Sequence, residues 1–528
     1  MQNKEVTSKI EMRHTTTIIH NYDIGDNEFI ERKFSIYNKT CHRLEPKGMY
    51  YDQENKDLYL PAGLEQYFID RSFGDDIYRK VYPDTYDKIP KVRLKYLPRD
   101  EKQKEAIRFC LGMDPYRRNL NKPQLQLNLN TGVGKTYVAV TTFAYLSIKT
   151  MMITSSLDWI DQWREKIKEY TDLKDDEIYT IAGMGTIAKL INGMKDISKI
   201  KFFLCSHSTL KSFAKKHGWN MVGALFRRLK IGVKIYDEAH LWFDNICMID
   251  FFTDTYKTFY LTATPIQSDY FDNRIYQSAF KTVPSIDLFD EDKDPHTKYI
   301  SILFNSHPRP QDIQECANVY GFDRIKYTDY LTTKENYYKI LKILLVMIEQ
   351  TISTQGKVLI YIGTNAAILK TFYWIRYNYP NLPVGLFSSL VPKDVKQREL
   401  ENKIILTTTK SAGAALDIKG LEMTIVLNEP FKSKVLTKQT FGRTRSDNTR
   451  YIDVVDVGFS TLKYYYTTKK PLFKKIATDC SEIQLSDYEI NQKLHEIFIN
   501  EQKQLESFQT NKNLKQVIEI TKTIGKSH

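Results

Sequence analysis

Residues 124–136 read QLQLNLNTGVGKT, and this stretch decides how the rest of the chain is interpreted. Its first half alternates polar and apolar residues, as a strand does, and the apolar, helix-like run YVAVTTFAYL follows its glycine-rich second half. A strand, a glycine-rich turn and a helix in this order are the context of a phosphate-binding loop. Leu129 stands where the usual motif has its first glycine, and on this motif alone a glycine-rich turn that merely precedes Lys-Thr stays open.

Each residue type in this loop suits the binding of ATP with Mg²⁺. Backbone N–H groups of the glycine-rich turn can approach the phosphates, and the helix N-terminus adds positive potential. The ammonium of Lys135 would reach the β- and γ-phosphates, and the hydroxyl of Thr136 would ligate Mg²⁺. The residues expected to bind the nucleotide here are Thr131, Gly132, Val133, Gly134, Lys135 and Thr136.

A pair of acidic residues follows a second strand about a hundred residues later. The run IGVKIY at 231–236 is typical of a buried strand, and DEAH follows it at 237–240. Ligands of open α/β sheets bind at the carboxyl ends of the strands, so these acids would face the phosphate loop. Asp237 would then hold Mg²⁺, and Glu238 would polarise the attacking water. Two adjacent carboxylates after a strand more often cap a helix, but the preceding phosphate loop favours catalysis.

Strand-like and helix-like segments alternate from about residue 98 and again from about residue 298. This alternation predicts an α/β fold in which helices cover both faces of a parallel sheet. Residues 1–97 have a β-rich sequence with 16 basic and 16 acidic residues and are expected to form a small accessory domain. The expected ranges are 1–97 for the accessory domain, 98–270 and 298–468 for the two α/β domains, 271–297 for a linker and 469–528 for a helical C-terminal extension.

Four motifs stand in the order of the superfamily 2 helicases. They are the Lys-Thr of the phosphate loop, DEAH at 237–240, LTATP at 261–265 and QTFGRTR at 439–445. The chain resembles this family over about residues 98–465, with closest similarity of text to bacteriophage and viral members. The resemblance implies two tandem RecA-like domains that bind ATP and Mg²⁺ between them. It also implies that His240, Thr262 and Thr264 couple ATP hydrolysis to movement.

The same resemblance assigns further residues on weaker matches. Gln103 corresponds to the glutamine that reads adenine, with a gap from Arg99 one residue longer than usual. Ser155 and Ser206 follow strands at places where the family contacts the nucleic-acid backbone. Trp159 and Trp163, four apart on one helix, are interpreted as core residues.

Two motifs near the C-terminal end depart from the family pattern. In TKSAGAALD at 409–417, Thr409 and Lys410 are expected to contact nucleic acid and Asp417 to contact the nucleotide, although Ala415 replaces the usual glycine. In QTFGRTR, the second arginine falls one place early, which displaces it by about 100° on a helix. The resemblance implies that Gln439 orders the attacking water, that Arg443 is the arginine finger and that Arg445 is its partner. The alternative is that the two arginines only form ion pairs with nearby aspartates and have no catalytic role.

The formal net charge of +13 is concentrated in two windows that contain no acidic residue. Nine basic residues lie between Asp196 and Asp237, and five lie between Glu429 and Asp447. We expect the windows to form a track for backbone phosphates, which carry no base information. For any individual lysine a solvated helix face is the simpler explanation. The nucleic-acid contacts expected from the first window are Lys211, Lys215, Arg227 and Arg228.

Composition narrows the class of protein further. Six cysteines lie far apart without metal-ligand spacing, and no apolar stretch is long enough to span a membrane, so a reduced intracellular protein of the cytoplasm is expected. The sequence favours an ATP-dependent DNA helicase or translocase without nuclease activity. An RNA helicase, and a nucleic-acid-stimulated ATPase that does not unwind, remain alternatives. Oligomeric state is left open.

Overall fold

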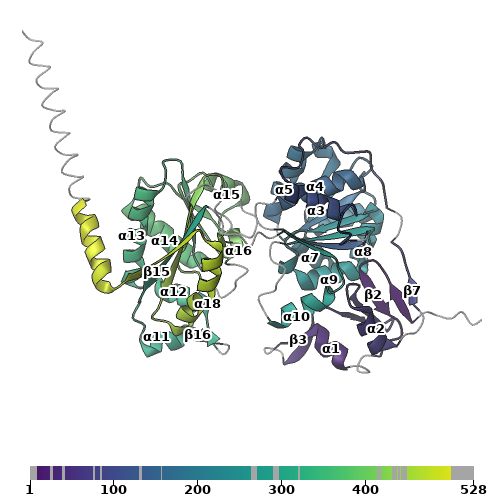
Figure 1. Ribbon diagram of the computed structural model, residues 1–528, viewed down its shortest axis with the longest axis horizontal. Coiled ribbons are helices and arrows are strands. Elements are labelled where there is room, and N and C mark those ends of the chain that lie inside the picture. The colour runs from purple at the N-terminus through teal and green to yellow at the C-terminus, as the bar shows by residue number, and fades with distance from the viewer. Residues whose placement is uncertain are drawn as a thin grey trace, which may run out of the picture. The chain divides into compact units, whose positions relative to one another are not determined.

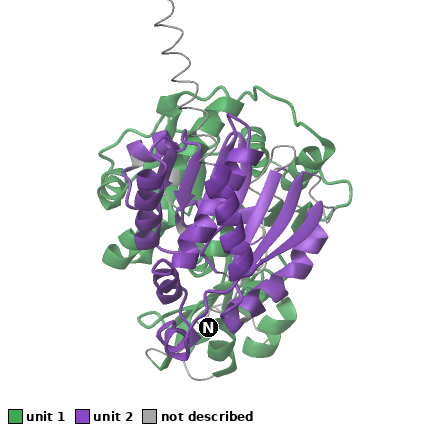
Figure 2. Cartoon of the chain, turned by 90° about the vertical axis from the view of Figure 1, so that its left-hand side faces the viewer, with its two compact units in different colours: residues 1–290 green, residues 291–528 purple. Residues whose placement is uncertain are grey.

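The structure is a computed structural model, and it divides the chain into two compact units, residues 1–290 and 291–528 (Figures 1 and 2). Each unit is built on its own seven-stranded sheet. The structure describes residues 9–23, 28–38, 42–74, 78–83, 86–119, 121–129, 134–155, 157–262, 270–288, 296–318, 321–412, 418–430, 437, 440–441 and 449–500.

The first unit begins with a small five-stranded sheet in the order β5-β6-β2-β1-β7. Strand β1 pairs antiparallel with β2 and parallel with β7. A separate hairpin, β3–β4, and two helices accompany it. Their bounds are β1 Ile10–Met12, β2 Thr16–Ile19, α1 Glu28–Phe34, β3 Ser35–Asn38, β4 Arg43–Pro46, β5 Tyr50–Asp52, β6 Asp57–Pro61, α2 Gln66–Phe73 and β7 Tyr78–Lys80.

This small sheet shares a hydrophobic core with the domain that follows it. Ile19, Phe34 and Leu60 belong to one buried cluster with Phe251 of α9 and Tyr276 of α10. The hydroxyls of Thr15 and Thr16 also donate to the backbone carbonyl of Asp250, at 2.9 and 2.7 Å. The N-terminal region therefore packs as part of the first unit, and a boundary at residue 97 stays a prediction.

The main sheet of the first unit is parallel throughout, in the order β10-β11-β9-β12-β13-β8-β14. This arrangement confirms the α/β fold expected from the alternation of segments. The strands are β8 Gln124–Leu129, β9 Thr150–Thr154, β10 Ile178–Ile181, β11 Phe202–Ser206, β12 Val233–Tyr236, β13 Lys257–Thr262 and β14 Ser285–Leu288. The helices are α3 Glu101–Cys110, α4 Lys135–Leu146, α5 Leu157–Tyr170, α6 Met184–Ile191, α7 His207–His217, α8 Trp219–Leu229, α9 Phe243–Phe252 and α10 Tyr270–Ala279, with short 3₁₀ turns η1 Asp175–Glu177 and η2 Ala239–Leu241.

Strand β8 is buried at all six positions although its sequence alternates. A buried amide needs a hydrogen-bond partner, and tyrosine hydroxyls provide it here. The side-chain amide of Gln124 donates to the Tyr260 hydroxyl at 2.7 Å, and that of Gln126 donates to Tyr276. The alternation therefore marks polar residues with internal partners on a central strand.

The expectation of a linker over 271–297 needs correction. Helix α10 occupies the start of this range, and β14 pairs in parallel with β8 at the edge of the first sheet. The sequence of β14, SIDL, alternates polar and apolar residues and is followed by an acidic segment. Only one face of the strand packs on the core, so its apolar residues are buried and Asp287 is exposed.

The second unit is also a parallel seven-stranded sheet, in the order β19-β20-β18-β21-β22-β15-β23. Its strands are β15 Thr297–Phe304, β18 Lys357–Tyr361, β19 Val384–Phe387, β20 Ile404–Thr407, β21 Leu421–Val426, β22 Thr449–Asp456 and β23 Asp479–Leu485, beside the hairpin β16 Ala317–Asn318 with β17 Gly321–Phe322. Its helices are α11 Pro310–Glu315, α12 Arg324–Leu331, α13 Glu335–Thr351, α14 Asn365–Asn378, α15 Lys393–Glu399, α16 Thr409–Ala412 and α18 Ser460–Ile476.

The C-terminal extension is not wholly helical. Helix α18 crosses the expected boundary at residue 469, and β23 pairs with β15 as an edge strand of the sheet. Six of the seven residues of β23 are exposed, so its sequence lacks the apolar pattern of a buried strand. Residues 487–500 are helical, and Ile490 of this segment belongs to the core of the second unit.

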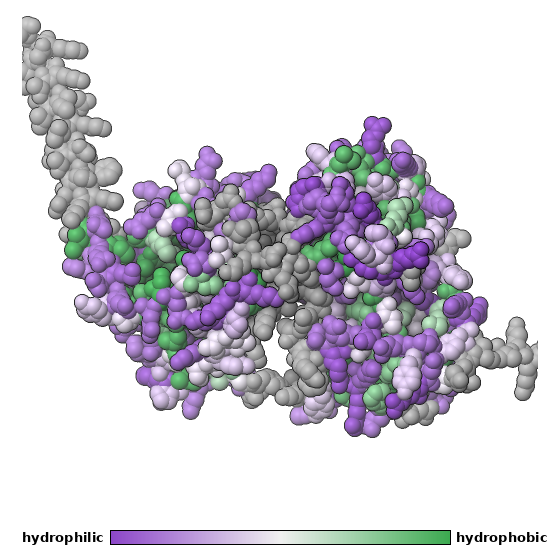
Figure 3. All heavy atoms as spheres, in the orientation of Figure 1, coloured by the Kyte–Doolittle hydropathy of each residue, from purple (hydrophilic) through white to green (hydrophobic). Residues whose placement is uncertain are grey.

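The surface carries mainly hydrophilic side chains with scattered apolar ones, as Figure 3 shows for one face. Among the described residues, no helix has both the length and the apolar character needed to cross a membrane.

Candidate nucleotide and nucleic-acid site

The phosphate loop joins β8 to α4 at the carboxyl end of a central strand. Gly134 has φ +92°, a left-handed value that favours glycine, and Lys135 begins the helix directly after it. Thr136 lies half-buried in the first turn of α4. Thr131, Gly132 and Val133 lie outside the described residues.

The lysine of this loop contacts the acidic pair that follows β12. Lys135 Nζ lies 2.5 Å from Glu238 Oε1, and only 3% of the Glu238 side chain is exposed. Because β12 and β8 are parallel strands of one sheet, their carboxyl ends meet at the same edge. The structure therefore brings together the two motifs that the sequence placed about a hundred residues apart.

Asp237 is held by two hydrogen bonds beside this ion pair. The Trp163 indole N–H donates to Oδ2 at 2.9 Å, and the backbone N–H of Glu238 donates to Oδ1 at 3.1 Å. Burial, followed by the charge of Glu238, raises the pKa of Asp237 to about 6, while Lys135 and Trp163 oppose the rise. Two buried carboxylates side by side repel each other, and a bound cation would relieve that repulsion.

The oxygen atoms at this edge suit Mg²⁺. The candidate ligands are the Thr136 hydroxyl and the Asp237 carboxylate, and hard oxygen ligands are those that Mg²⁺ prefers. The carboxylate pair next to a lysine also suits a nucleotide phosphate chain with its metal ion.

Trp163 is a site residue that sequence reasoning missed. It was interpreted as a core residue, and its ring is indeed 5% exposed, but its N–H binds the Asp237 carboxylate. The spacing of Trp159 and Trp163 on α5 shows only that both face the core. A hydrogen bond between segments 74 residues apart leaves no local signal in the sequence.

Replacing Trp163 with phenylalanine should lower the rate of ATP hydrolysis about tenfold or more, because a hydrogen bond to a charged group contributes roughly 1.5–3 kcal/mol. The pKa of Asp237 should rise further, so more Mg²⁺ should be needed for half-maximal activity. The matched control is Trp159→Phe, one turn earlier on the same helix and equally buried at 6% exposure. Steady-state ATPase assays over a Mg²⁺ series measure both effects, and equal rates for the two variants would contradict the assigned role.

Gln103 lies against the phosphate loop. A Cβ atom built on Gly134 would come within 2.5 Å of Gln103 Nε2, so the two residues are in direct proximity. The side-chain oxygen of Gln103 accepts a hydrogen bond from the Arg99 backbone at 2.8 Å, and Asp100 caps α3 through the Gln103 N–H. The extra residue between Arg99 and Gln103 thus does not move the glutamine away from the loop.

The structure also joins the second and third motifs. His240 Nδ1 lies 2.8 Å from the Thr262 hydroxyl at the end of β13, and both residues are buried. His240 Nδ1 lies 3.5 Å from Glu238 Oε2 as well. Burial lowers the pKa of His240 to about 4, so the ring is neutral at neutral pH. Thr264 lies outside the described residues.

The two serines proposed as backbone contacts have different surroundings. The Ser155 hydroxyl is buried at the end of β9 and has no hydrogen-bond partner within the described part of the chain. Ser206 is fully buried, and its hydroxyl caps α7 by accepting from the Thr209 N–H at 3.2 Å. The geometry of Ser206 therefore explains how α7 begins, whereas Ser208, two residues later, is exposed.

A stack of aromatic rings links α7 to the acidic pair, and sequence reasoning did not foresee it. His207 lies between Tyr236, which precedes Asp237, and Trp242, which follows η2, with ring centroids 5.7 and 5.6 Å away and interplanar angles of 10°. The Asn245 side-chain amide also contacts His207 Nδ1 at 3.0 Å. This packing fixes the start of α7 relative to the DEAH segment.

The first acid-free window is not one continuous basic surface, which corrects the expectation of a single phosphate track. Lys234 is fully buried against Asp250, Lys201 lies 2.5 Å from Glu177, and Lys230 lies 3.3 Å from Asp87. The absence of acidic residues from this stretch of sequence does not exclude ion pairs, because the acidic partners of these lysines lie in other segments of the chain. The exposed members are Lys199, Lys211, Lys215, Lys216, Arg227, Arg228 and Lys230, the last of which is the partner of Asp87.

The exposed basic residues fall into two groups. Lys211 and Lys215 lie on α7, which starts at the carboxyl end of β11. Arg227 and Arg228 lie in the last turn of α8, shortly before β12 begins, and thus toward the opposite edge of the sheet. Within α7, Lys211 is therefore nearer the nucleotide edge than Lys215, which lies in the last turn.

In the second unit, Thr409 is bound by a buried glutamate. The Thr409 N–H donates to Glu429 Oε2 at 2.8 Å, and its hydroxyl donates to the other carboxylate oxygen. Burial raises the pKa of Glu429 to about 7. Lys410 lies in α16, but its side chain is not described, and Asp417, Gln439, Arg443 and Arg445 lie outside the described residues.

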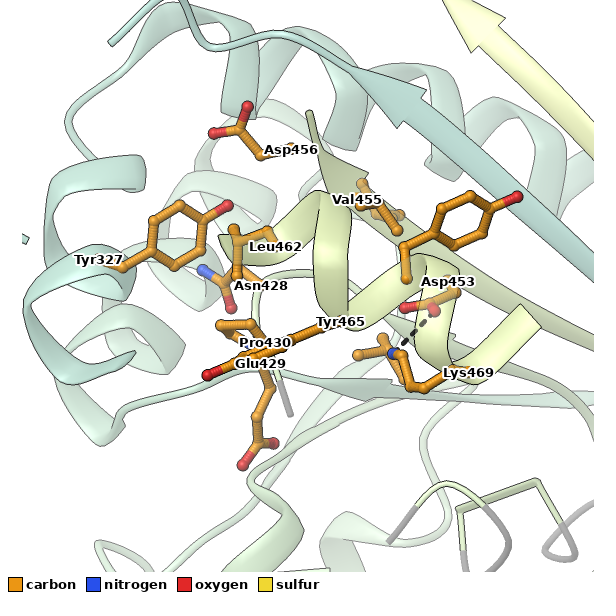
Figure 4. A pocket seen from close by; sticks show the side chains of 13 residues that line it. Tyr327, Asn428, Glu429, Pro430, Asp453, Val455, Asp456, Leu462, Tyr465 and Lys469 are labelled. Carbon is orange, nitrogen blue, oxygen red and sulfur yellow. Dashed lines mark hydrogen bonds and ion pairs between the residues drawn. The ribbon is translucent and has the colours of Figure 1, made fainter. Parts of the chain in front are cut away.

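A small cavity lies next to Glu429 at the carboxyl ends of β21 and β22 (Figure 4). Its volume is about 20 Å³, which accommodates about one water molecule. Lys469 closes one side through an ion pair with Asp453 at 2.9 Å. The cavity is too small for a nucleotide.

The chain is built of two tandem parallel-sheet domains of the RecA-like type, and in the first a phosphate-loop lysine contacts a carboxylate pair. Residues 97–267 match the family model described as "Type III restriction enzyme, res subunit". The fold is similar to that of Mss116p bound to single-stranded RNA and AMP-PNP, with a TM-score of 0.50, 14% identity, and coverage of 75% of this chain and 80% of that chain. Dbp5 of S. cerevisiae bound to RNA and ADP BeF3 is a further similar structure, with a TM-score of 0.46, 13% identity, and coverage of 75% and 97%. No curated protein matches the sequence.

Proposed function

We propose that the chain is an ATP-dependent DNA helicase or translocase that hydrolyses ATP to move along or remodel duplex or branched DNA. The contact of Lys135 with Glu238, 2.5 Å long at the carboxyl edge of a parallel sheet, is the observation that carries this proposal. It joins the residue suited to bind phosphate with the residue suited to polarise water. The resemblance to the superfamily 2 helicases supports the coupling of that chemistry to nucleic acid.

Residues of the first unit would share the work of hydrolysis. Lys135 would exchange Glu238 for the β- and γ-phosphates, which frees the Glu238 carboxylate to orient the attacking water. Thr136 and Asp237 would hold Mg²⁺, which supplies charge stabilisation to the transferring phosphoryl group. Trp163 keeps the Asp237 carboxylate in place. His240 and Thr262 would pass the change at Glu238 to the end of β13.

We assign the remaining catalytic roles to the second unit on the motif alone. Arg443 is the arginine finger, Arg445 its partner and Gln439 a ligand of the attacking water, while Asp417 contacts the nucleotide. Arg443→Ala should therefore abolish turnover while ATP still binds.

The choice of DNA rests on the resemblance to bacteriophage and viral members, some of which act on forked or branched DNA. The matched family model names a restriction-enzyme subunit, whereas the similar structures hold RNA. An RNA helicase, and a stimulated ATPase that does not unwind, are therefore the two competing functions.

Strand-displacement assays on forked DNA, forked RNA and blunt duplex DNA distinguish the three functions. We expect displacement of forked DNA that depends on ATP and is absent in Glu238→Gln. Displacement of RNA alone would show an RNA helicase. Stimulated ATP hydrolysis without displacement of any substrate would show a remodeller or sensor.

Reversing the charge of Lys211 and Lys215 should weaken DNA binding about tenfold or more and lower DNA-stimulated ATPase. Each lost phosphate contact should also reduce the slope of log affinity against log salt by about 0.9 on duplex DNA. The control is Lys80→Glu with Lys91→Glu, which reverses two exposed charges within residues 1–97. Titrations at several salt concentrations measure the effect, and equal losses in both double variants would show that the charges serve solubility alone.

A further inference from the structure

A cavity of about 300 Å³ lies between the N-terminal region and the first parallel sheet. Tyrosine rings dominate its walls: Tyr86 and Tyr256 lie 5.2 Å apart with an angle of 33° between their planes, and Tyr82 meets His14 edge-to-face at 6.1 Å. We refer to this cavity, lined by His14, Tyr82, Tyr86, Asn121, Tyr256 and Lys257, as the tyrosine pocket. Its volume is at the lower end of the range for pockets that hold small ligands.

Hydrogen bonds hold the rim of the pocket in a fixed position. Lys257 Nζ donates to the backbone carbonyls of Asn121 and Lys122 at 3.1 and 2.7 Å, and to Asn121 Oδ1 at 2.8 Å. Because an ammonium group only donates, the Asn121 oxygen must face Lys257, which leaves the amide NH₂ as a donor at the exposed rim. Similarly, His14 Nδ1 lies 3.0 Å from the Thr255 carbonyl and must donate to it, so Nε2 remains as an acceptor.

The charge of the residues that line the pocket favours a ligand that is part of a negatively charged polymer. No carboxylate lines the pocket among the described residues, whereas the ammonium group of Lys257 does. Lys122, next to Asn121, is exposed and can meet a backbone phosphate. Flat tyrosine faces suit a nucleobase, since stacking on aromatic rings tolerates every base.

We propose that the tyrosine pocket binds an unpaired base of a nucleic-acid strand by stacking, a proposal that rests on nucleic acid being the partner under the proposed function. Asn121 and His14 would offer a donor and an acceptor to the base edge, and Lys122 would neutralise the adjacent phosphate. The pocket lies near the amino ends of β8 and β13, since Pro123 and Tyr256 directly precede these strands. It is therefore at the edge opposite the ATP site, and a strand can occupy it while ATP is bound.

The test compares Tyr82→Ala, and Tyr82→Ala combined with Tyr256→Ala, with the parent chain. Tyr82 is 74% exposed, so its replacement leaves the fold intact, and the control Tyr67→Ala removes a 71% exposed tyrosine from α2. We expect the double variant to bind fluorescein-labelled single-stranded DNA about tenfold more weakly or worse, and blunt duplex with little change, because duplex bases are already stacked. ATP hydrolysis without nucleic acid should be unchanged.

An abasic strand of the same length makes the test specific to bases. The parent should bind it more weakly, and the tyrosine replacements should cause no further loss on it. Equal binding of single-stranded DNA by parent and double variant, or an equal loss on the abasic strand, overturns the pocket proposal alone. If the parent chain binds neither DNA nor RNA, the proposed function falls, and the pocket proposal falls with it.

Discussion

Replacing Glu238 with glutamine should reduce ATP turnover by about a hundredfold or more while ATP binding is kept. Catalytic groups that act on charge developing in the transition state typically contribute about 100- to 1000-fold each. The substitution keeps the shape of the side chain but removes the carboxylate that polarises water. Turnover in the presence of DNA, together with ATP binding measured by equilibrium titration, separates the chemical step from binding.

The same substitution should lessen the pH dependence of the stability of the nucleotide-free protein. Glu238 raises the pKa of Asp237, so Gln at this position removes a repulsion between two buried carboxylates. Because the folded-state pKa of Asp237 is above its ordinary value, the folded chain binds more protons there, and stability falls as pH rises from about 4 to about 6. The variant should show a smaller fall over this range, as measured by thermal unfolding.

Lys135→Ala serves as the opposing case. It should also abolish turnover, but it weakens ATP binding and leaves two buried carboxylates without their cation, so the nucleotide-free protein should unfold more easily. Glu165→Gln and Lys189→Ala, both on exposed helix faces, are the matched controls. Parent-like turnover in either Glu238→Gln or Lys135→Ala would refute the assignment of the ATP site.

The two central motifs were predictable because each is local. The phosphate loop and DEAH both follow runs with clear strand character, and strand direction in a parallel sheet then places them at one edge. The contacts that complete the site are not local. Trp163 has the spacing of a core residue, and only the fold shows that its N–H meets Asp237.

Edge strands and buried charges were the other limits of sequence reasoning. Strand β23 is mostly exposed, and β14 is a short edge strand next to an acidic segment of the sequence. Neither therefore has the continuous apolar run that is typical of a central strand. Lys234 lies in a fully buried strand, but a count of charges along the chain treats it as a surface residue. Its partner Asp250 lies on α9, and no sequence pattern pairs the two.

Replacing Lys234 with methionine should destabilise the first unit by about 3–5 kcal/mol. Lys234 is fully buried and donates to Asp250 Oδ1 at 2.6 Å and to the Thr253 carbonyl at 2.6 Å. Removing one partner of a buried pair leaves the other charge uncompensated, which is the costly outcome. Tryptophan fluorescence during urea unfolding reports mainly on this unit, since four of the five tryptophans lie in it.

A second substitution separates the cost of the stranded charge from the cost of lost packing. Asp250 also accepts hydrogen bonds from the hydroxyls of Tyr236 and Tyr260, at 2.7 and 2.6 Å, so Asn at this position keeps an acceptor without the charge. Lys234→Met combined with Asp250→Asn should therefore recover part of the lost stability, and the two changes should not be additive.

Lys234 lies on β12 three residues before Asp237, so loss of its ion pair should also affect the ATP site. The control Lys215→Met, an exposed lysine of the same acid-free window, should change stability by no more than about 0.5 kcal/mol. If Lys234→Met unfolded at the same urea concentration as this control, the pair with Asp250 would not stabilise the unit. If it unfolded earlier, turnover should fall with temperature in step with unfolding, because the same strand carries the catalytic carboxylates.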